Sequence, residues 1–314
     1  MSNKIPCRQA FTDRLTELAA ENKDIVVVTS DARGSVTLTK FADTYPEQFI
    51  EVGIAEQNEV GIAAGLATFG KQVFACAPAC FLSARSLEQV KIDVAYSKTN
   101  VKLIGISGGV SYGALGNSHH SLHDIAVMRA FPDLTVIIPS DAEQSRQMTD
   151  ALVGMKGAAY VRMGRGAVPD IYQRGKPCFT LGKSNTLTEG SDISIIACGE
   201  MVYIALQGAE LLKQQGISAR VIDMHTLKPL DKQSILKAAD ETSAILTIEE
   251  HSIMGGLGAA VAETVVQNNP VPMTIMGIPD ETTVTGNSSE IFNHYGLTAD
   301  GVAEQAKLLL SRCK

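Results

Sequence analysis

One carboxylate, Glu56, stands where a short apolar run gives way to a helix-forming stretch. The run ends in Gly53-Ile54-Ala55, and small residues dominate 61–69. A carboxylate at such an elbow can protonate or hydrogen-bond a heterocycle held in a cleft between subunits. It can equally cap the helix and interact favourably with its dipole. The pattern alone leaves both roles open.

Three histidines, His119, His120 and His123, form the second candidate site. They follow small, turn-forming residues at 113–118 that come after a strand-like run. We therefore expect a loop at the carboxyl edge of a sheet, where ligands of open α/β sheets bind. One imidazole there can transfer a proton or bind a hydroxyl group. The competing interpretations are a zinc site, although no fourth ligand is evident, and a solvent-facing histidine without a role.

Two further strand ends carry candidate binding residues. Phe81 lies at a strand-to-helix joint, where its ring can stack on a planar group or pack into the core. Asp31, Arg33 and Ser35 occupy another strand-end loop. An arginine beside a helix N-terminus can bind an anion there, and the alternative is three ordinary loop residues.

Motifs for nucleotide phosphates are absent or incomplete. Gly255-Gly256-Leu257-Gly258 lacks the G-x-G-x-x-G spacing and a suitably placed acidic residue, so a tight turn that opens a helix explains it better. A nicotinamide-dependent oxidoreductase has only these glycines in its favour. The chain has no G-x-x-x-x-G-K-[ST] loop, and no Gly-Asp-Gly followed by the Asn pair that carries the diphosphate-bridging Mg²⁺ of thiamine enzymes. If the chain uses a thiamine cofactor, another chain must supply the diphosphate site.

These residues must be positioned by short β-branched runs that alternate with helical patterns. The alternation predicts an α/β protein with parallel, doubly wound sheets, and the continuous apolar strands predict sheets covered on both faces. In the first half we expect a helix capped by Ser140 or Asp141, a helix at 83–96, and strands at 25–29, 72–75, 101–106, 134–138 and 159–163. In the second half we expect strands at 193–197, 219–224, 244–248 and 272–276, and helices at 201–215, 231–239, 257–268 and 299–311.

A stretch with several glycines and prolines and no periodicity, 164–182, separates the two series. We therefore predict two domains, at 1–170 and 191–314, joined by a linker at 171–190. Each domain is long enough to form its own core.

The composition restricts the class of protein and its partners. With 45% hydrophobic and 19% charged residues, the chain should be globular with sizeable buried interfaces. A net charge of −7 without a basic run argues against nucleic acid. The six cysteines form no C-x-x-C pair and are expected to be buried thiols. No signal peptide opens the chain, and no apolar run approaches the roughly 18 residues of a membrane span. We expect a reduced, cytoplasmic protein.

The sequence resembles the C-terminal half of transketolases, particularly the small subunit of the split, two-chain forms. It is also similar to the corresponding half of 1-deoxyxylulose-5-phosphate synthase. The resemblance covers nearly the whole chain. It is carried by 30–31, 51–57, 81–89, 116–124, 138–141, 161–165 and 249–252.

The resemblance implies a pyrimidine-binding domain followed by a transketolase C-terminal domain, with thiamine diphosphate as cofactor. Glu56 matches the glutamate that hydrogen-bonds the aminopyrimidine ring, and Phe81 matches the residue that stacks on it. Arg85 belongs to the same cofactor-binding segment. His119 matches a loop histidine that contacts the substrate, and is the second expected catalytic residue. The implied reaction transfers a two-carbon unit from a ketose to an aldehyde.

The resemblance also assigns residues to substrate binding. Asp31 and Ser35 match positions near the substrate channel. Arg8 and Arg165 fall near arginines that bind the anionic tail of a substrate. No metal ligand of this chain is implied, because the resemblance assigns the Mg²⁺ site to the partner subunit.

Three positions depart from the family pattern. Leu115 stands where the family usually has an acidic residue that reads a substrate hydroxyl. Ser107 and Gly108 stand where related enzymes carry a His or Arg that helps to hold phosphate. An unusual sugar, or another anion such as a sulfonate, is therefore as open as an ordinary sugar phosphate.

The resemblance implies an N-terminal partner subunit that binds Mg²⁺ and the diphosphate, in at least an α₂β₂ assembly with large apolar interfaces. Two alternatives use the same cofactor for a different reaction: an enzyme of the deoxyxylulose-phosphate synthase type, or the β subunit of a 2-oxoacid dehydrogenase. A non-catalytic partner subunit is the alternative of a different class.

Overall fold

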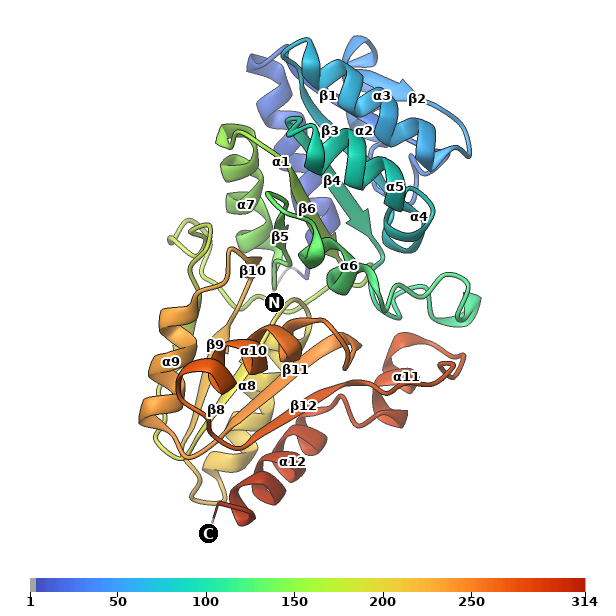
Figure 1. Cartoon of the computed structure of the whole chain (residues 1–314). Coiled ribbons are helices and arrows are strands. Elements are labelled where there is room, and N and C mark those ends of the chain that lie inside the picture. The colour runs from blue at the N-terminus through green and yellow to red at the C-terminus, as the bar shows by residue number, and fades with distance from the viewer. Residues whose placement is uncertain (1–3, 314) are drawn as a thin grey trace.

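The computed structural model describes residues 4–313, so the first three residues of the predicted first domain and the last residue of the second lie outside it. Two α/β halves are stacked end to end, with the N-terminal half at the top of Figure 1 and the C-terminal half below it. Among the described residues, the helices are all too short or too polar to cross a bilayer.

The first sheet contains seven strands in the order β10-β5-β6-β4-β3-β1-β2. The neighbours pair in parallel, except that β10 is antiparallel to β5. Every residue of β1, β4 and β6 is buried, as expected for strands covered on both faces. The strands are β1 Ile25–Thr29, β2 Phe49–Glu51, β3 Gln72–Pro78, β4 Val101–Ile106, β5 Thr135–Ile137, β6 Ala159–Met163 and β10 Thr226–Lys228.

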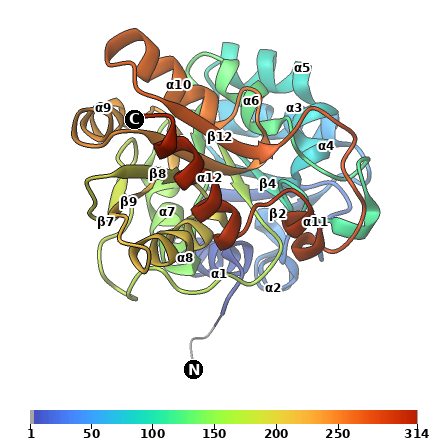
Figure 2. The same ribbon diagram turned by 90° about the horizontal axis from the view of Figure 1, so that it is seen from below.

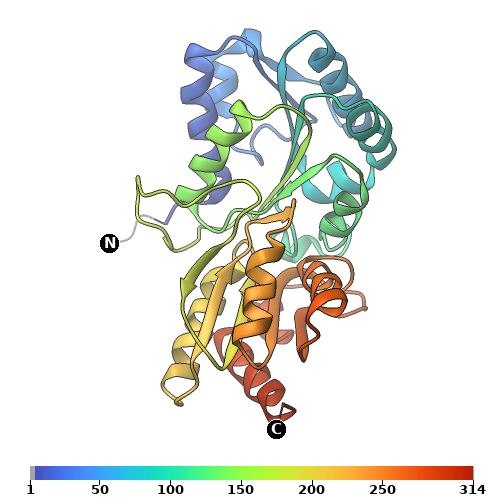
Figure 3. The ribbon, with the colours of Figure 1, turned by 60° about the vertical axis from the view of Figure 1, so that its left-hand side comes forward.

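Helices cover both faces of this sheet, as the side view in Figure 3 shows. The hydrophobic residues of α1, α2 and α7 share one core cluster, and those of α3, η2 and α6 belong to another. The helices and turns are α1 Cys7–Glu21, α2 Thr39–Thr44, η1 Pro46–Gln48, α3 Glu56–Thr68, α4 Ala79–Ala84, α5 Leu87–Gln89, η2 Val90–Tyr96, η3 Gly113–Leu115, α6 Asp124–Ala130 and α7 Ala142–Gly154.

The second sheet contains five strands in the order β12-β11-β8-β9-β7, parallel except for β7. Helices α8 and α12 pack together on one face, and α9 and α10 cover the other (Figure 2). The elements are β7 Asn185–Thr188, β8 Ile193–Ala197, α8 Met201–Lys213, β9 Ala219–Asp223, α9 Lys232–Glu241, β11 Ile245–Ser252, α10 Leu257–Asn268, β12 Met273–Ile278, α11 Ser288–His294 and α12 Ala299–Ser311.

The α/β prediction with two wound sheets is confirmed, and antiparallel edge strands make both sheets mixed. Strand β7 lies inside the predicted linker and pairs with β9. Strand β10 leaves the C-terminal half and pairs with β5 of the first sheet. One hydrophobic cluster also contains residues of both halves, such as Val136 and Ile138 with Ile222 and Leu227. The two halves therefore share a core.

Two local predictions have different outcomes. Asp141 caps α7, because its side chain accepts a hydrogen bond from the Gln144 amide. The continuous helix predicted at 83–96 is wrong, since this region is divided into the end of α4, α5 and the π-helical turn η2. Ser83 and Ser86 donate side-chain hydrogen bonds to the carbonyls four residues earlier, a pattern that bends helices.

Candidate active site

The predicted site residues meet at the carboxyl edge of the first sheet. Neighbouring strands β6, β4, β3 and β1 all point the same way, so the segments that follow them emerge at one edge. Those segments carry Arg165 after β6, His119 in the loop after β4, Phe81 in α4 after β3, and Asp31 after β1. Glu56 begins α3, which follows the edge strand β2.

Glu56 is bound to a side chain rather than to its own helix. The residue is 2% exposed, and Ala55, not Glu56, occupies the capping position without a side-chain hydrogen bond. The Arg85 guanidinium donates to both carboxylate oxygens, at 2.8 and 2.7 Å. The guanidinium carbon of Arg85 also lies 4.3 Å from the centre of the Phe81 ring, a cation–π contact. Arg85 therefore covers the two groups that the sequence assigns to the pyrimidine.

The His119 ring continues this row of side chains. It lies edge-on to Phe81, with ring centres 5.2 Å apart, and edge-on to Tyr112 at 5.4 Å. Its Nδ1 is 2.9 Å from the Ser118 hydroxyl. The guanidinium of Arg165 lies 5.2 Å from the Tyr112 ring centre. The contacts form one continuous row from Glu56 to Arg165.

Two arginines end this row with side-chain nitrogens that lack a partner. Arg8 donates to the Ser35 backbone carbonyl, and its pKa is lowered by burial and then by the charge of Arg165. Arg8 Nε and Arg165 Nη1 are buried and have no hydrogen-bond partner among residues 4–313. Two neighbouring cations with free donors are suited to an anion.

Asp31, Arg33 and Ser35 do not act as a group. Asp31 is exposed and adopts a left-handed backbone conformation, with φ at 52°. Its amide donates to the Glu51 side chain at 2.7 Å. Arg33 is paired with Asp43, so its charge is already compensated. Ser35 contributes its carbonyl to Arg8.

The three histidines bind different partners. His120 is buried between the Thr283 hydroxyl and the Gly113 carbonyl, at 2.7 and 3.0 Å. His123 is exposed, with its Nε2 3.3 Å from the Ser83 hydroxyl. In residues 4–313 no group of three or more His, Cys, Asp and Glu side chains is placed to hold a metal ion. The arrangement gives no support to the zinc interpretation.

Of the three positions that depart from the family pattern, Gly108 has a structural explanation. A Cβ at Gly108 would collide with the Arg162 side chain. That guanidinium is held by the Asp124 carboxylate, 3.2 Å from Nε, and donates to the Glu250 carbonyl. The space near Gly108 is thus filled by a cation that is already paired. Leu115 is 55% exposed on the same loop.

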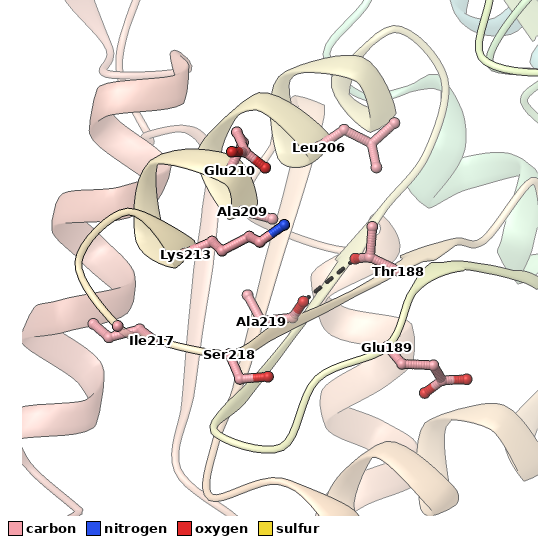
Figure 4. Close-up of a pocket in the computed structure, with 10 residues that line it drawn as sticks. Thr188, Glu189, Leu206, Ala209, Glu210, Lys213, Ile217, Ser218 and Ala219 are labelled. Carbon is pink, nitrogen blue, oxygen red and sulfur yellow. Dashed lines mark hydrogen bonds between the residues drawn. The ribbon is translucent and has the colours of Figure 1, made fainter.

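Of two cavities, one adjoins the row of side chains from Glu56 to Arg165 and the other lies apart from it. One, of about 550 Å³, is lined by Phe81, Arg85, Ser118, His120 and His123 among others, and adjoins the row. Another, of about 410 Å³, lies between α8 and the start of β9 (Figure 4). Its wall includes Lys213 and Glu210 and belongs entirely to the C-terminal half.

The glycine-rich turn at 255–258 opens α10, as expected, and does not offer its amides to a ligand. The carboxylate of Glu249 accepts hydrogen bonds from Leu257 and Gly258, at 2.6 and 2.7 Å. Burial raises the pKa of Glu249 to about 7. A protein carboxylate thus occupies the helix N-terminus where a nucleotide phosphate would bind.

Sequence reasoning missed Tyr112, Glu59 and Glu250. Tyr112 links His119 to Arg165, and nothing in its local sequence marks it. Glu59 follows Glu56 by one helical turn, a spacing that was available as a signal. Glu250 acts on a loop 140 residues away in sequence, which no local pattern reveals.

Comparison with protein families matches both halves of the chain. The transketolase pyrimidine-binding domain matches residues 3–170, and the transketolase C-terminal domain matches residues 182–302.

Among known sequences, one subunit of an apulose-4-phosphate transketolase from Phocaeicola vulgatus is 58% identical over 97% of each chain. A 6-deoxy-6-sulfo-D-fructose transketolase subunit from a Clostridium species is 37% identical, over 97% of this chain and 94% of that one. The 1-deoxy-D-xylulose-5-phosphate synthase of Heliobacterium modesticaldum is also 37% identical, and the match spans 46% of its length.

Among solved structures, a split-gene transketolase in an inactive β4 tetramer superposes with a TM-score of 0.91, at 37% identity over 99% of this chain and 100% of that one. The similarities to the two transketolase subunits and to the split-gene enzyme thus extend over nearly the full length of each chain. The chain therefore belongs to the transketolase family of transferases, with its pyrimidine-binding domain first and its C-terminal domain second.

Proposed function

We propose that the chain is the pyrimidine-binding subunit of a thiamine-diphosphate-dependent transketolase that transfers a two-carbon ketol unit from an anionic ketose to an aldehyde. The observation that carries the proposal is the row Glu56–Arg85–Phe81–His119–Tyr112–Arg165 at one sheet edge. It joins a buried carboxylate, an aromatic face, an imidazole and a cation in the order that such a reaction needs.

The residues present fit the pyrimidine end of the cofactor. Glu56 offers a buried carboxylate for a ring nitrogen, and Phe81 offers a flat face beside a cavity of about 550 Å³. The Arg85 side chain, which is 47% exposed, lies over both. We infer that it swings outward when the ring binds. Bound thiamine diphosphate supplies the chemistry that breaks and forms a carbon–carbon bond next to a carbonyl.

Glu56 holds and transfers a proton at the ring nitrogen, and its burial keeps water away from that proton. His119 contacts the Phe81 ring and is the second proposed catalytic residue, since its ring nitrogens can exchange a proton with, or orient, a substrate hydroxyl. Its position is fixed on two sides by Phe81 and Tyr112.

The substrate's anionic end is assigned to Arg8 and Arg165. Each carries a buried nitrogen without a partner within residues 4–313, and a guanidinium pair can bind a phosphate or sulfonate through charge-assisted hydrogen bonds. Ser35 positions Arg8 through its carbonyl, and exposed Asp31 lies at the rim. Relatives are named for apulose 4-phosphate and for 6-deoxy-6-sulfo-D-fructose, which supports an anionic and uncommon ketose.

An N-terminal partner subunit is proposed to supply the diphosphate and Mg²⁺ sites, in an α₂β₂ assembly. The face beside Glu56, which we call the α3–η2 face, exposes large apolar residues that are uncommon on a solvated surface. They are Ile54, Ile62, Phe69, Ile92 and Tyr96, of which Phe69 is 89% exposed. The similar Phocaeicola vulgatus protein is named as one subunit of its enzyme rather than as the whole enzyme, which supports the partner.

The domain division proposed for the chain is 1–170 and 191–314, with 171–190 between them. The family matches at 3–170 and 182–302 support it.

The test of function replaces Glu56 with Gln and assays two-carbon transfer from a ketose phosphate with the partner present. Turnover should fall about 10²–10⁴-fold, the usual contribution of a positioned proton donor. Glu47→Gln, at an exposed carboxylate in the same half, is the matched control. Turnover of Glu56→Gln close to wild type would sink the catalytic role and favour a non-catalytic partner subunit.

A deoxyxylulose-phosphate type of reaction is the second candidate, because the synthase of Heliobacterium modesticaldum is as similar as the sulfofructose enzyme. The two differ in the donor. Release of CO₂ from pyruvate with formation of a deoxyketose would identify the synthase, and transfer from a ketose without CO₂ would identify the transketolase.

A further inference from the structure

The loop that carries His119 leaves the first half and lies against the C-terminal half. In Figure 1 the loop after β4, drawn in sea green, lies above the red segment that leads to α11. Its two ends are closed on each other by paired backbone hydrogen bonds between Gly109 and Ser121, at 3.0 and 2.8 Å. Between these ends, Glu250, Thr283 and Ser288 of the C-terminal half form side-chain hydrogen bonds with the loop.

Glu250, at the end of β11, binds the start of the loop. Its Oε1 accepts a hydrogen bond of 2.7 Å from the amide of Val110, which is fully buried. A buried amide without this partner would be costly, so the contact fixes where the loop starts. Gly109 has a φ of 61°, and a Cβ there would collide with Glu250 and Arg162. The close approach of this carboxyl to the backbone thus requires glycine.

The region between β12 and α11 binds the middle of the loop. The Thr283 hydroxyl is 2.7 Å from His120 Nδ1, and His120 Nε2 donates to the Gly113 carbonyl at 3.0 Å. His120 is 4% exposed, and burial lowers its pKa, so the neutral ring with its proton on Nε2 satisfies both contacts. Ser288 adds a bond of 3.3 Å to the Val110 carbonyl. The residue next to His119 is therefore held by the C-terminal half.

A charged cluster lies beneath this contact, between the two halves. Arg162 of β6 is buried with the Asp124 carboxylate and donates to the Glu250 carbonyl. Tyr160 donates to the same Asp124 oxygen at 2.7 Å. Burial, and then the charge of Glu200, raises the pKa of Glu250 to about 8. Glutamine keeps one acceptor oxygen in the same shape and is the close isostere of this side chain.

We propose that the C-terminal domain sets the conformation of the His119 loop, with Glu250 and Thr283 as positioning residues that act through Val110 and His120. This inference rests on the proposed function only for the role of His119. It gives the C-terminal domain a part in the site without contact to the reacting atoms.

The first test follows hydrogen–deuterium exchange of the peptide spanning 108–121 in the chain alone. Glu250→Ala removes the acceptor and should raise exchange there about tenfold, the effect of one lost buried hydrogen bond. Glu250→Gln keeps an acceptor oxygen and should restore exchange to within about twofold of wild type. Glu304→Ala, at an exposed carboxylate of α12, is the control and should leave the loop unchanged.

The second test uses a gentler pair, in case Glu250→Ala unfolds the chain. Thr283→Val removes the buried hydroxyl and keeps the shape, whereas Thr282→Val changes the exposed neighbouring residue. Only Thr283→Val should raise exchange at 113–121. With the partner present it should lower kcat/KM for the ketose about tenfold or more and leave the affinity for thiamine diphosphate unchanged, since Glu56 and Phe81 are untouched.

Unchanged loop exchange in both Glu250→Ala and Thr283→Val would overturn the inference, whatever happens to turnover. Raised exchange with unaltered kcat/KM supports control of the loop by the C-terminal domain, and would instead contradict the proposed role of His119. The two proposals can thus fail separately.

Discussion

Glu59 is a buried carboxyl group that the proposed reaction does not use. It is 0% exposed, and the effect of burial on its pKa outweighs the opposing hydrogen bonds of the Ser30 side chain and the Cys76 backbone. Burial raises its pKa to about 8, and the negative charges of Glu56 and Glu51 add to the effect. In the unfolded chain the same carboxyl has its ordinary value near 4.5. Folding therefore binds a proton at neutral pH.

This shift predicts a loss of stability on the alkaline side. The folded-state pKa lies above the unfolded one, so the stability from this group is complete below about pH 4.5 and declines as the pH rises toward 8. Between pH 5 and pH 8 the free energy of unfolding should fall by on the order of 3 kcal/mol through this residue. Glu59→Gln should remove this residue's share of the slope and leave the shares of Glu249 and Glu250, as measured by urea unfolding at several pH values.

The slopes of the unfolding free energy against pH are compared rather than its absolute values, because a buried amide lowers the stability by the same amount at every pH. Glu47→Gln, an exposed replacement, should keep the wild-type slope. If Glu59→Gln loses stability with pH as steeply as wild type, Glu59 is not the group that takes up the proton.

At the residue scale, the sequence predicted which residues form the candidate site, but not which of their side chains contact one another. Glu56, Phe81 and His119 were found because each has a distinctive local setting at a strand end. The pairing of Glu56 with Arg85, 29 residues later, and the place of Tyr112 between His119 and Arg165 depend on how separate elements pack. No spacing rule in the sequence encodes those contacts.

Helix α3 is the element that links the carboxylate to the expected partner. Gly65 lies on its exposed side, and a Cβ there would meet no atom within 4 Å. The exposed Ile62 and Phe69 lie three residues before and four residues after it, on the same side of the chain at this helix. A glycine in a helix lowers its stability, so an exposed one is better explained by close approach of another chain.

Gly65→Ala should therefore have opposite effects on the chain and on the assembly. Alone, the chain should gain about 0.5–1 kcal/mol of unfolding free energy, because alanine is the better helix former. With the partner, affinity should fall about tenfold, since one misplaced methyl in a packed interface costs about 1–3 kcal/mol. Calorimetric melting and sedimentation of the mixture measure the two effects.

Gly154→Ala is the matched control, because a Cβ on this glycine would also point into open space, at the end of α7. It should leave assembly intact. If Gly65→Ala binds the partner with the same affinity as wild type, the α3–η2 face is not the surface that contacts the partner.

Elements were predicted where a hydrophobic run is long. The apolar runs at 25–29, 101–106, 159–163 and 193–197 are strands with those bounds. Strand β2 was expected only as an apolar run before Gly53, and strands β7 and β10 were missed, because runs of three or four residues on a sheet edge need little apolar surface and leave a weak pattern. The antiparallel edges were missed with them.

On the scale of the whole molecule, the two halves should unfold as one. They share a hydrophobic cluster, strand β10 belongs to the first sheet, and Asp223 of the second half binds Ser140 and Gln144 of the first, at 3.0 and 2.8 Å. We predict a single calorimetric transition, with a van't Hoff enthalpy equal to the calorimetric one.

Limited trypsin treatment gives a second readout of the same prediction. The exposed segment at 173–177 contains Arg174, after which trypsin can cut, whereas the bond after Lys176 is protected by Pro177. The nicked halves should elute together in gel filtration, because the shared core and β10 remain in place. Two separate transitions, or fragments that elute apart, would show independent domains.

The crossing of β10 bears on how a gene for such a protein can be divided in evolution. A break at 171–190 would leave one product without a strand of its sheet, β10, which the other product would have to insert from outside. An unfilled sheet edge invites aggregation. Fission at that point would be selected against, so the two domains of this polypeptide are expected to be inherited as one unit.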